Sequence, residues 1–139
     1  MSLETYQGSC HCGAIRFEAA VDFEEGSNRC NCSYCAKVRA WFAFAKGVER
    51  FRLIENAGIA EYRWTPPGDS EPHLTFTFCR ICGVRTFARG ELESLGGTFH
   101  AVHVPALELS PEGFAAIPVR YINGRERRYD ETPACPHAL

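Results

Sequence analysis

The sequence predicts a mainly β protein of short antiparallel strands with one or two short helices. Apolar and polar residues alternate over several short runs, turn-forming residues separate those runs, and few segments carry a helix-start signal. The chain has 139 residues, of which 45% are hydrophobic and 12% aromatic. A chain of this length and composition can bury a core, so we expect one domain over residues 1–139.

The clearest strand signal follows the first cysteine pair. Ile15, Phe17 and Ala19 are apolar, and the residues between them are the charged Arg16 and Glu18. A period of two is typical of a strand with one buried face. Similar short runs predict further strands over residues 41–45, 51–54, 60–64, 74–78, 84–89 and 98–104.

Two segments carry helix-start signals. Ser33 is placed to cap a short helical turn over residues 34–38, and Ser110 followed by Pro111 predicts a second short helix. The other polar stretches are interpreted as loops or solvated surface, at residues 22–29, 65–72 and 125–131.

Charge and the N-terminal sequence limit the classes of function. The formal net charge of −2 argues against a nucleic-acid binder that relies on bulk positive charge. The first residues lack the basic and apolar regions of a secretory signal, and no apolar run reaches the ~18 residues of a membrane span. We therefore expect a cytoplasmic protein without a membrane partner, whose cysteines are reduced.

Eight cysteines are many for a chain of this length, and their close spacing favours metal binding over a disulfide framework. Two chelating turns form a matched pair, because each ends in glycine and leads into a predicted strand. Four thiolates from two such turns make a closed tetrahedral zinc site, which is a structural site. The predicted ligands of this site are Cys10, Cys12, Cys79 and Cys82.

The remaining cluster is Cys30, Cys32 and Cys35, a Cys-x-Cys-x-x-Cys stretch. Three ligands leave a tetrahedral metal with one coordination position for water or substrate, as in catalytic zinc sites. Cys135 is the alternative fourth ligand, and a redox centre that forms disulfides within the stretch is another reading. His11, between two predicted ligands, is expected to point away from the metal.

An open three-thiolate zinc favours a soft, sulfur-bearing guest, and glutathione is a natural one. The cations near the cysteines are candidates for holding its carboxylates, although most such side chains are simply solvated; they are Arg29, Lys37, Arg39 and Arg80. The aromatic residues of 41–45 are assigned to the core in preference to a pocket wall. His100 and His103 should face opposite sides of one strand.

These motifs resemble a known family. The order Cys-x-Cys-Gly, Cys-Asn-Cys-Ser-x-Cys and Phe-Cys-x-x-Cys-Gly is similar to that of the glutathione-dependent formaldehyde-activating enzymes, a family that includes centromere protein V. The resemblance spans roughly residues 8 to 110.

The resemblance implies a zinc-containing β-tent-like fold with two zinc ions per chain. It assigns the structural zinc to Cys10, Cys12, Cys79 and Cys82, and the catalytic zinc to Cys30, Cys32 and Cys35. The implied activity is that of a carbon–sulfur lyase, which condenses a glutathione-type thiol with formaldehyde or a related small aldehyde. The alternative is a zinc-stabilised binding module without catalysis.

The sequence departs from the family pattern near the predicted catalytic site. Ala36 precedes Lys37 where a basic residue often follows the third cysteine directly, and Ala40 stands where glycine is common. His103 replaces a frequent asparagine. These differences concern the choice of substrate more than metal binding.

Overall fold

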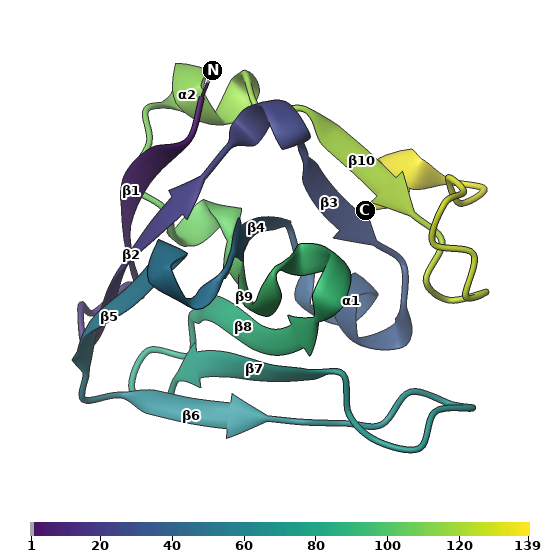
Figure 1. The fold of residues 1–139 in the computed structure, drawn as a ribbon, viewed down its shortest axis with the longest axis horizontal. Helices are drawn as coiled ribbons and strands as arrows, with labels where there is room; N and C mark the ends of the chain where they lie inside the picture. The colour runs from purple at the N-terminus through teal and green to yellow at the C-terminus, as the bar shows by residue number, and fades with distance from the viewer. Residues whose placement is uncertain (1) are drawn as a thin grey trace.

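The computed structural model describes residues 2–139 and contains two β-sheets. The smaller sheet has the order β1-β2-β5, and both of its pairings are antiparallel. Its strands are β1 (Glu4–Ser9), β2 (Ile15–Val21) and β5 (Phe51–Asn56). In Figure 1 these strands lie on the left, β3 and β10 lie at the upper right, and β6 and β7 run along the bottom.

The larger sheet has the order β10-β3-β4-β9-β8-β7-β6. All its pairings are antiparallel except that of β3 with β10, which is parallel. Its strands are β3 (Ser27–Cys30), β4 (Phe42–Lys46), β6 (Ile59–Tyr62), β7 (Leu74–Cys79), β8 (Arg85–Leu92), β9 (Gly97–His103) and β10 (Val119–Ile122). The predicted mainly β class with antiparallel sheets is confirmed.

Two short helices complete the fold, α1 (Ser33–Val38) and α2 (Pro111–Ala115). As predicted, Ser110 caps α2, and its Oγ accepts a hydrogen bond from the Gly113 N–H at 3.0 Å. The predicted cap of α1 was wrong, because Cys32 and not Ser33 occupies that position. The Cys32 sulfur accepts from the Cys35 N–H, whereas Ser33 is exposed. None of the described helices is long and apolar enough to cross a membrane.

The predicted strands are present, and three more were missed. The stretch 22–29, interpreted as a loop, includes the first three residues of β3, and β1 and β10 were not predicted. Ser27 shows why β3 forms: its N–H and its hydroxyl both donate to the Pro118 carbonyl, and its side chain is buried. A contact 91 residues away in sequence produces this strand, so the local pattern does not reveal it.

The larger sheet has apolar residues packed on both faces. The main core contains the inward residues of β2 together with Ala43 and Ala45 of β4. The alternate residues Phe42 and Phe44 pack with a second cluster around Phe76. The strand β4 therefore separates a main core from a satellite cluster.

Candidate metal centre and substrate cleft

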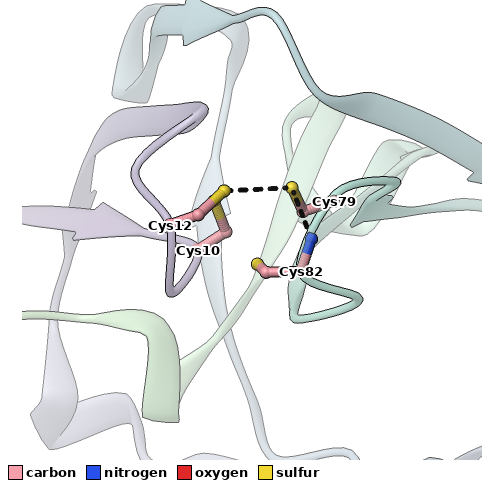
Figure 2. A group of neighbouring side chains, drawn as sticks. All are labelled: Cys10, Cys12, Cys79 and Cys82. Atoms are coloured by element: carbon pink, nitrogen blue, oxygen red, sulfur yellow. Dashed lines mark hydrogen bonds between the residues drawn. The ribbon is translucent and has the colours of Figure 1, made fainter.

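Four cysteines from two distant turns meet at one point. Cys10 and Cys12 lie in the turn that follows β1, Cys79 ends β7, and Cys82 lies in the turn before β8. Their sulfur atoms all lie within 4.8 Å of one another. Figure 2 shows the two turns facing each other, with Cys12 Sγ 3.6 Å from Cys79 Sγ.

The sulfur separations fit a tetrahedral metal site. A Zn–S bond of about 2.3 Å places the sulfurs of a tetrahedron roughly 3.8 Å apart, whereas a disulfide needs about 2.05 Å. The Cys10–Cys12 and Cys12–Cys79 sulfur distances are 3.7 and 3.6 Å. All eight cysteines are free. The sequence prediction that these four residues come together is thus met, and the donor set suits a metal ion.

Backbone N–H groups support the thiolates of this cluster. The Ile15 N–H donates to Cys10 Sγ at 3.3 Å, and the N–H groups of Ile81 and Cys82 donate to Cys79 Sγ at 3.4 and 3.5 Å. Such hydrogen bonds favour the charged form of the acceptor. These hydrogen bonds form only if the backbone of each turn curls around the sulfur atom.

Glycine makes both turns possible. Gly13 has a φ of 85° and Gly83 a φ of 79°, in the left-handed region that residues with a side chain rarely adopt. The backbone N–H of Val84, in the second turn, and that of Cys12, in the first turn, lower the pKa of the Cys82 thiol to about 6. The Cys-x-x-Cys-Gly pattern therefore creates a local preference for thiolate.

The second cluster comes from a single stretch of chain. Cys30 ends β3, Cys32 caps α1, and Cys35 lies in the first turn of that helix. Their three sulfurs lie within 4.8 Å of one another, and no fourth cysteine, histidine or carboxylate joins them among residues 2–139. The Cys32 N–H donates to Cys30 Sγ at 3.4 Å and the Cys35 N–H to Cys32 Sγ at 3.3 Å.

The three thiols of this cluster share hydrogen bonds. Those from Cys30 and Cys35 lower the pKa of the Cys32 thiol far below its ordinary value. The same contacts, with burial, raise the pKa of Cys35. Of these two thiols, Cys32 therefore favours the thiolate form and Cys35 the neutral form.

The other candidate ligands lie away from both clusters in the described part of the chain. Cys135 is exposed and belongs to neither group, and His11 is exposed between two clustered cysteines. His100 stacks on Phe51 with ring centroids 3.9 Å apart. His103 has different neighbours and lies beside the backbone carbonyl of Arg85.

A cleft of about 450 Å³ opens over the second cluster. Cys30, Cys32 and Cys35 line it, and so do Phe42 and Phe44. These two aromatic residues were predicted to lie in the core; they pack against the satellite cluster and also form a wall of the cleft. The face of β4 that carries Phe42 and Phe44 contributes to both the satellite cluster and the cleft. The alternation of apolar residues predicts a strand but does not tell a core face from a cleft wall.

None of the four candidate cations for carboxylate binding lines this cleft in the described structure. Arg29 stacks over the Trp41 ring at 4.7 Å, and Arg39 donates to the carbonyl of Ala138. The arginines that do line the cleft are Arg125 and Arg127. They belong to the segment that was interpreted as solvated surface.

A small cavity of about 10 Å³ lies between α1 and the larger sheet. Three buried polar atoms around it have no hydrogen-bond partner among the described residues: Tyr34 OH, Arg85 Nη1 and His103 Nε2. Burial lowers the pKa of His103, which favours the neutral ring. The space is about that of one water molecule, which would satisfy these atoms.

The fold and site define a β protein with two cysteine clusters that can bind metal. A sequence model of the family described as glutathione-dependent formaldehyde-activating enzyme matches residues 5–116, a range that includes all seven clustered cysteines. The chain belongs to this family, as its cysteine order predicted.

Two known proteins are similar to this chain. Over 39 residues the chain is 44% identical to a Halomonas elongata protein named "Putative glutathione-dependent formaldehyde-activating enzyme". That match covers 28% of this chain and 25% of the relative. The crystal structure of a Rhodobacter sphaeroides protein is similar with a TM-score of 0.62 and 26% identity, covering 82% of this chain and 99% of the other.

Proposed function

We propose that this protein is a zinc-dependent carbon–sulfur lyase that joins a glutathione-type thiol to formaldehyde or a related small aldehyde. The observation that carries the proposal is the contrast between the two clusters. One brings together four cysteines, enough to close a tetrahedral site, whereas Cys30, Cys32 and Cys35 supply three ligands and line a cleft. Three protein ligands with access for a small molecule are typical of a catalytic zinc site.

In the forward reaction the thiol sulfur adds to the carbonyl carbon. A C–S bond forms, the C=O π bond breaks, and the proton of the thiol ends on the carbonyl oxygen, which gives an S-hydroxymethyl product from formaldehyde. Cys30, Cys32 and Cys35 would hold a zinc ion, which would offer a coordination position to a thiol sulfur and lower the pKa of that thiol.

The chain's own residues perform two tasks in this scheme. The backbone N–H groups of Cys32 and Cys35 orient the ligand sulfurs and stabilise their charge. The rings of Phe42 and Phe44 line the cleft and reduce the access of water to the reacting atoms. Cys10, Cys12, Cys79 and Cys82 would hold a second, structural zinc ion. The eight free thiols suit a reducing compartment, so we place the protein in the cytoplasm.

The test combines metal analysis with an NMR measurement of exchange between free and glutathione-bound formaldehyde. We expect two zinc ions per chain in the wild type and one in Cys32→Ser, and we expect acceleration of the exchange only in the wild type. Cys135→Ser is the matched control, because Cys135 is exposed and outside both clusters. It should keep both zinc ions and full activity.

Two results would overturn the proposal. If the zinc-loaded wild type did not accelerate exchange over the spontaneous rate, the protein would be a binding module braced by zinc. If Cys32→Ser retained two zinc ions and full activity, the cleft cluster would not be the catalytic site.

A further inference from the structure

The cleft over the three-cysteine cluster is walled mainly by apolar side chains. Its lining includes aromatic rings from β4, β7, the 63–73 loop and the C-terminal segment, namely Phe42, Phe44, Phe76, Trp64 and Tyr129. Pro66, Pro67 and Leu74 extend this apolar surface. Charged or amide groups of a ligand that lie against such a wall lose their hydrogen bonds to water and find no partners there, which weakens binding.

One side of the cleft lies outside the part of the chain that matches the family. Ile122, Gly124, Arg125, Arg127 and Tyr129 line the cleft, whereas the family match ends at residue 116. This segment, residues 122–129, is therefore a feature through which the chain can differ from its relatives in substrate.

The 122–129 segment is fastened directly to the cysteine cluster. Asn31, between two of the clustered cysteines, donates from its backbone N–H to the Ile122 carbonyl at 3.1 Å, and its side-chain amide donates to Asn123 Oδ1 at 3.0 Å. The Arg125 N–H donates to Asn31 Oδ1 at 2.9 Å. A Cβ on Gly124 would lie 2.4 Å from Cys30 Sγ, so the segment rests on that sulfur.

The two arginines of the segment differ in their availability to a ligand. Arg127 is paired with Asp69 at 2.6 Å and also donates to the Pro67 carbonyl at 2.5 Å. Arg125 uses its Nε to donate to the Asn31 carbonyl at 3.1 Å. Its Nη1 and Nη2 have no hydrogen-bond or ion-pair partner among residues 2–139. Its guanidinium is therefore held in place with its outer edge free for one carboxylate.

From these contacts we propose that the thiol taken by this chain has an aromatic or alkyl body and a single carboxylate, which Arg125 binds. The proposal rests on the proposed function in that the thiol sulfur reacts at Cys30, Cys32 and Cys35. The apolar body lies against the rings of the cleft. Glutathione, with two carboxylates, an ammonium group and two peptide bonds, leaves polar groups unpaired against this wall, so it binds more weakly while its sulfur still reaches the cluster and reacts there.

Four thiols separate the contributions to binding, measured by titration calorimetry on the zinc-loaded protein. 2-Mercapto-3-phenylpropanoate carries a ring and one carboxylate, mercaptoacetate lacks the ring, 2-phenylethanethiol lacks the carboxylate, and glutathione is the polar reference. We expect 2-mercapto-3-phenylpropanoate to bind at least about tenfold more tightly than each of the other three, because it alone fills both the apolar wall and the free edge of Arg125.

Arg125→Gln tests the carboxylate contact, with Arg128→Gln as the matched control, since Arg128 pairs with Glu131 and does not line the cleft. Arg125→Gln should weaken 2-mercapto-3-phenylpropanoate by about tenfold and leave 2-phenylethanethiol unchanged. Arg128→Gln should change neither. Zinc content is measured for each variant, and if Arg125→Gln loses zinc, the comparison of the four thiols on the wild type decides alone.

The proposal is overturned if glutathione binds as tightly as the aromatic thiol, or if Arg125→Gln, with its zinc retained, weakens both aromatic thiols equally. These outcomes are independent of catalysis. Accelerated exchange without preferential binding of the aromatic thiol would contradict this inference but support the proposed function. Preferential binding of the aromatic thiol without accelerated addition would support this inference but contradict the proposed function.

Discussion

The two cysteine clusters use the same local chemistry in different surroundings. Each places backbone N–H groups against its sulfurs, as at Cys79 in one cluster and at Cys32 in the other. In the first, Cys10 and Cys79 belong to the main core, with 3% and 0% of their surfaces exposed. The second lines a cleft beside the satellite cluster. Two turns that meet beside the main core suit a structural site, whereas one turn beside a cleft leaves access for a small molecule.

The largest expected effect concerns stability. Cys79→Ser should lower the melting temperature by more than about 10 °C or abolish cooperative unfolding, because a structural zinc contributes about 10–16 kcal/mol in zinc-finger peptides, comparable to a whole domain's stability. Cys32→Ser should shift it by less than about 5 °C, since its cluster ties together residues of one short stretch. Calorimetric melting of the zinc-loaded proteins measures both.

The control for this comparison is Cys135→Ser, which should melt as the wild type does. If Cys32→Ser melted as low as Cys79→Ser, both clusters would be structural. The functional contrast between them would then fail.

The sequence revealed the cysteine clusters because their chemistry is local. The spacing of Cys79 and Cys82 with Gly83 after them already specifies a chelating turn, and the alternation around Phe17 identifies a buried strand. Pairing the first turn with the turn at Cys79 followed from the need for four ligands. The turn and the strand are each specified by a few neighbouring residues, and the pairing of the turns follows from the number of ligands that zinc needs.

The walls of the cleft could not be predicted in the same way. Arg125 and Tyr129 lie in a charged segment whose pattern indicates only exposure, and both are indeed exposed. They become part of the site because β10 pairs with β3 and carries the segment across the cluster. Likewise, the sequence around Phe44 fits a core position as well as a position beside a cleft.

The next effect compares two glycines that cross over cysteine sulfurs. A Cβ at Gly124 would lie 2.4 Å from Cys30 Sγ, and a Cβ at Gly58 would lie 2.9 Å from Cys79 Sγ. Real side chains do not tolerate such contacts, so each alanine variant must displace its segment, at about 1–3 kcal/mol. Gly124→Ala should weaken zinc binding by the cleft cluster about tenfold with little change in melting temperature. Gly58→Ala should lower the melting temperature by several degrees.

Competition with a chromophoric chelator measures the zinc affinities, and thermal melting measures the stabilities. Equal losses of stability in both variants would contradict the separation of the two sites. An unchanged zinc affinity of the cleft cluster in Gly124→Ala would also contradict it.

The last prediction concerns a dependence of stability on pH at His100. His100 is buried, with 8% of its surface exposed, and stacks on Phe51 of the smaller sheet. Burial, together with the charge of Arg89, lowers the pKa of His100 to about 4. Between about pH 6.5 and 4 the unfolded chain therefore binds a proton that the folded chain does not, and stability falls as the pH drops through this window.

The loss attributable to His100 is about 2 kcal/mol between pH 7.5 and pH 5, from about 1.4 kcal/mol per pH unit below the unfolded pKa. Urea unfolding at the two pH values measures it. His100→Gln should remove this part of the pH dependence, whereas His137→Gln, at an exposed position near the C-terminus, should keep it. Acid also competes with metal for thiolates in every variant, so the difference between variants isolates the histidine. An identical pH slope in His100→Gln and the wild type would mean that the folded protein admits the proton at His100, and that its stacking on Phe51 does not keep the ring neutral.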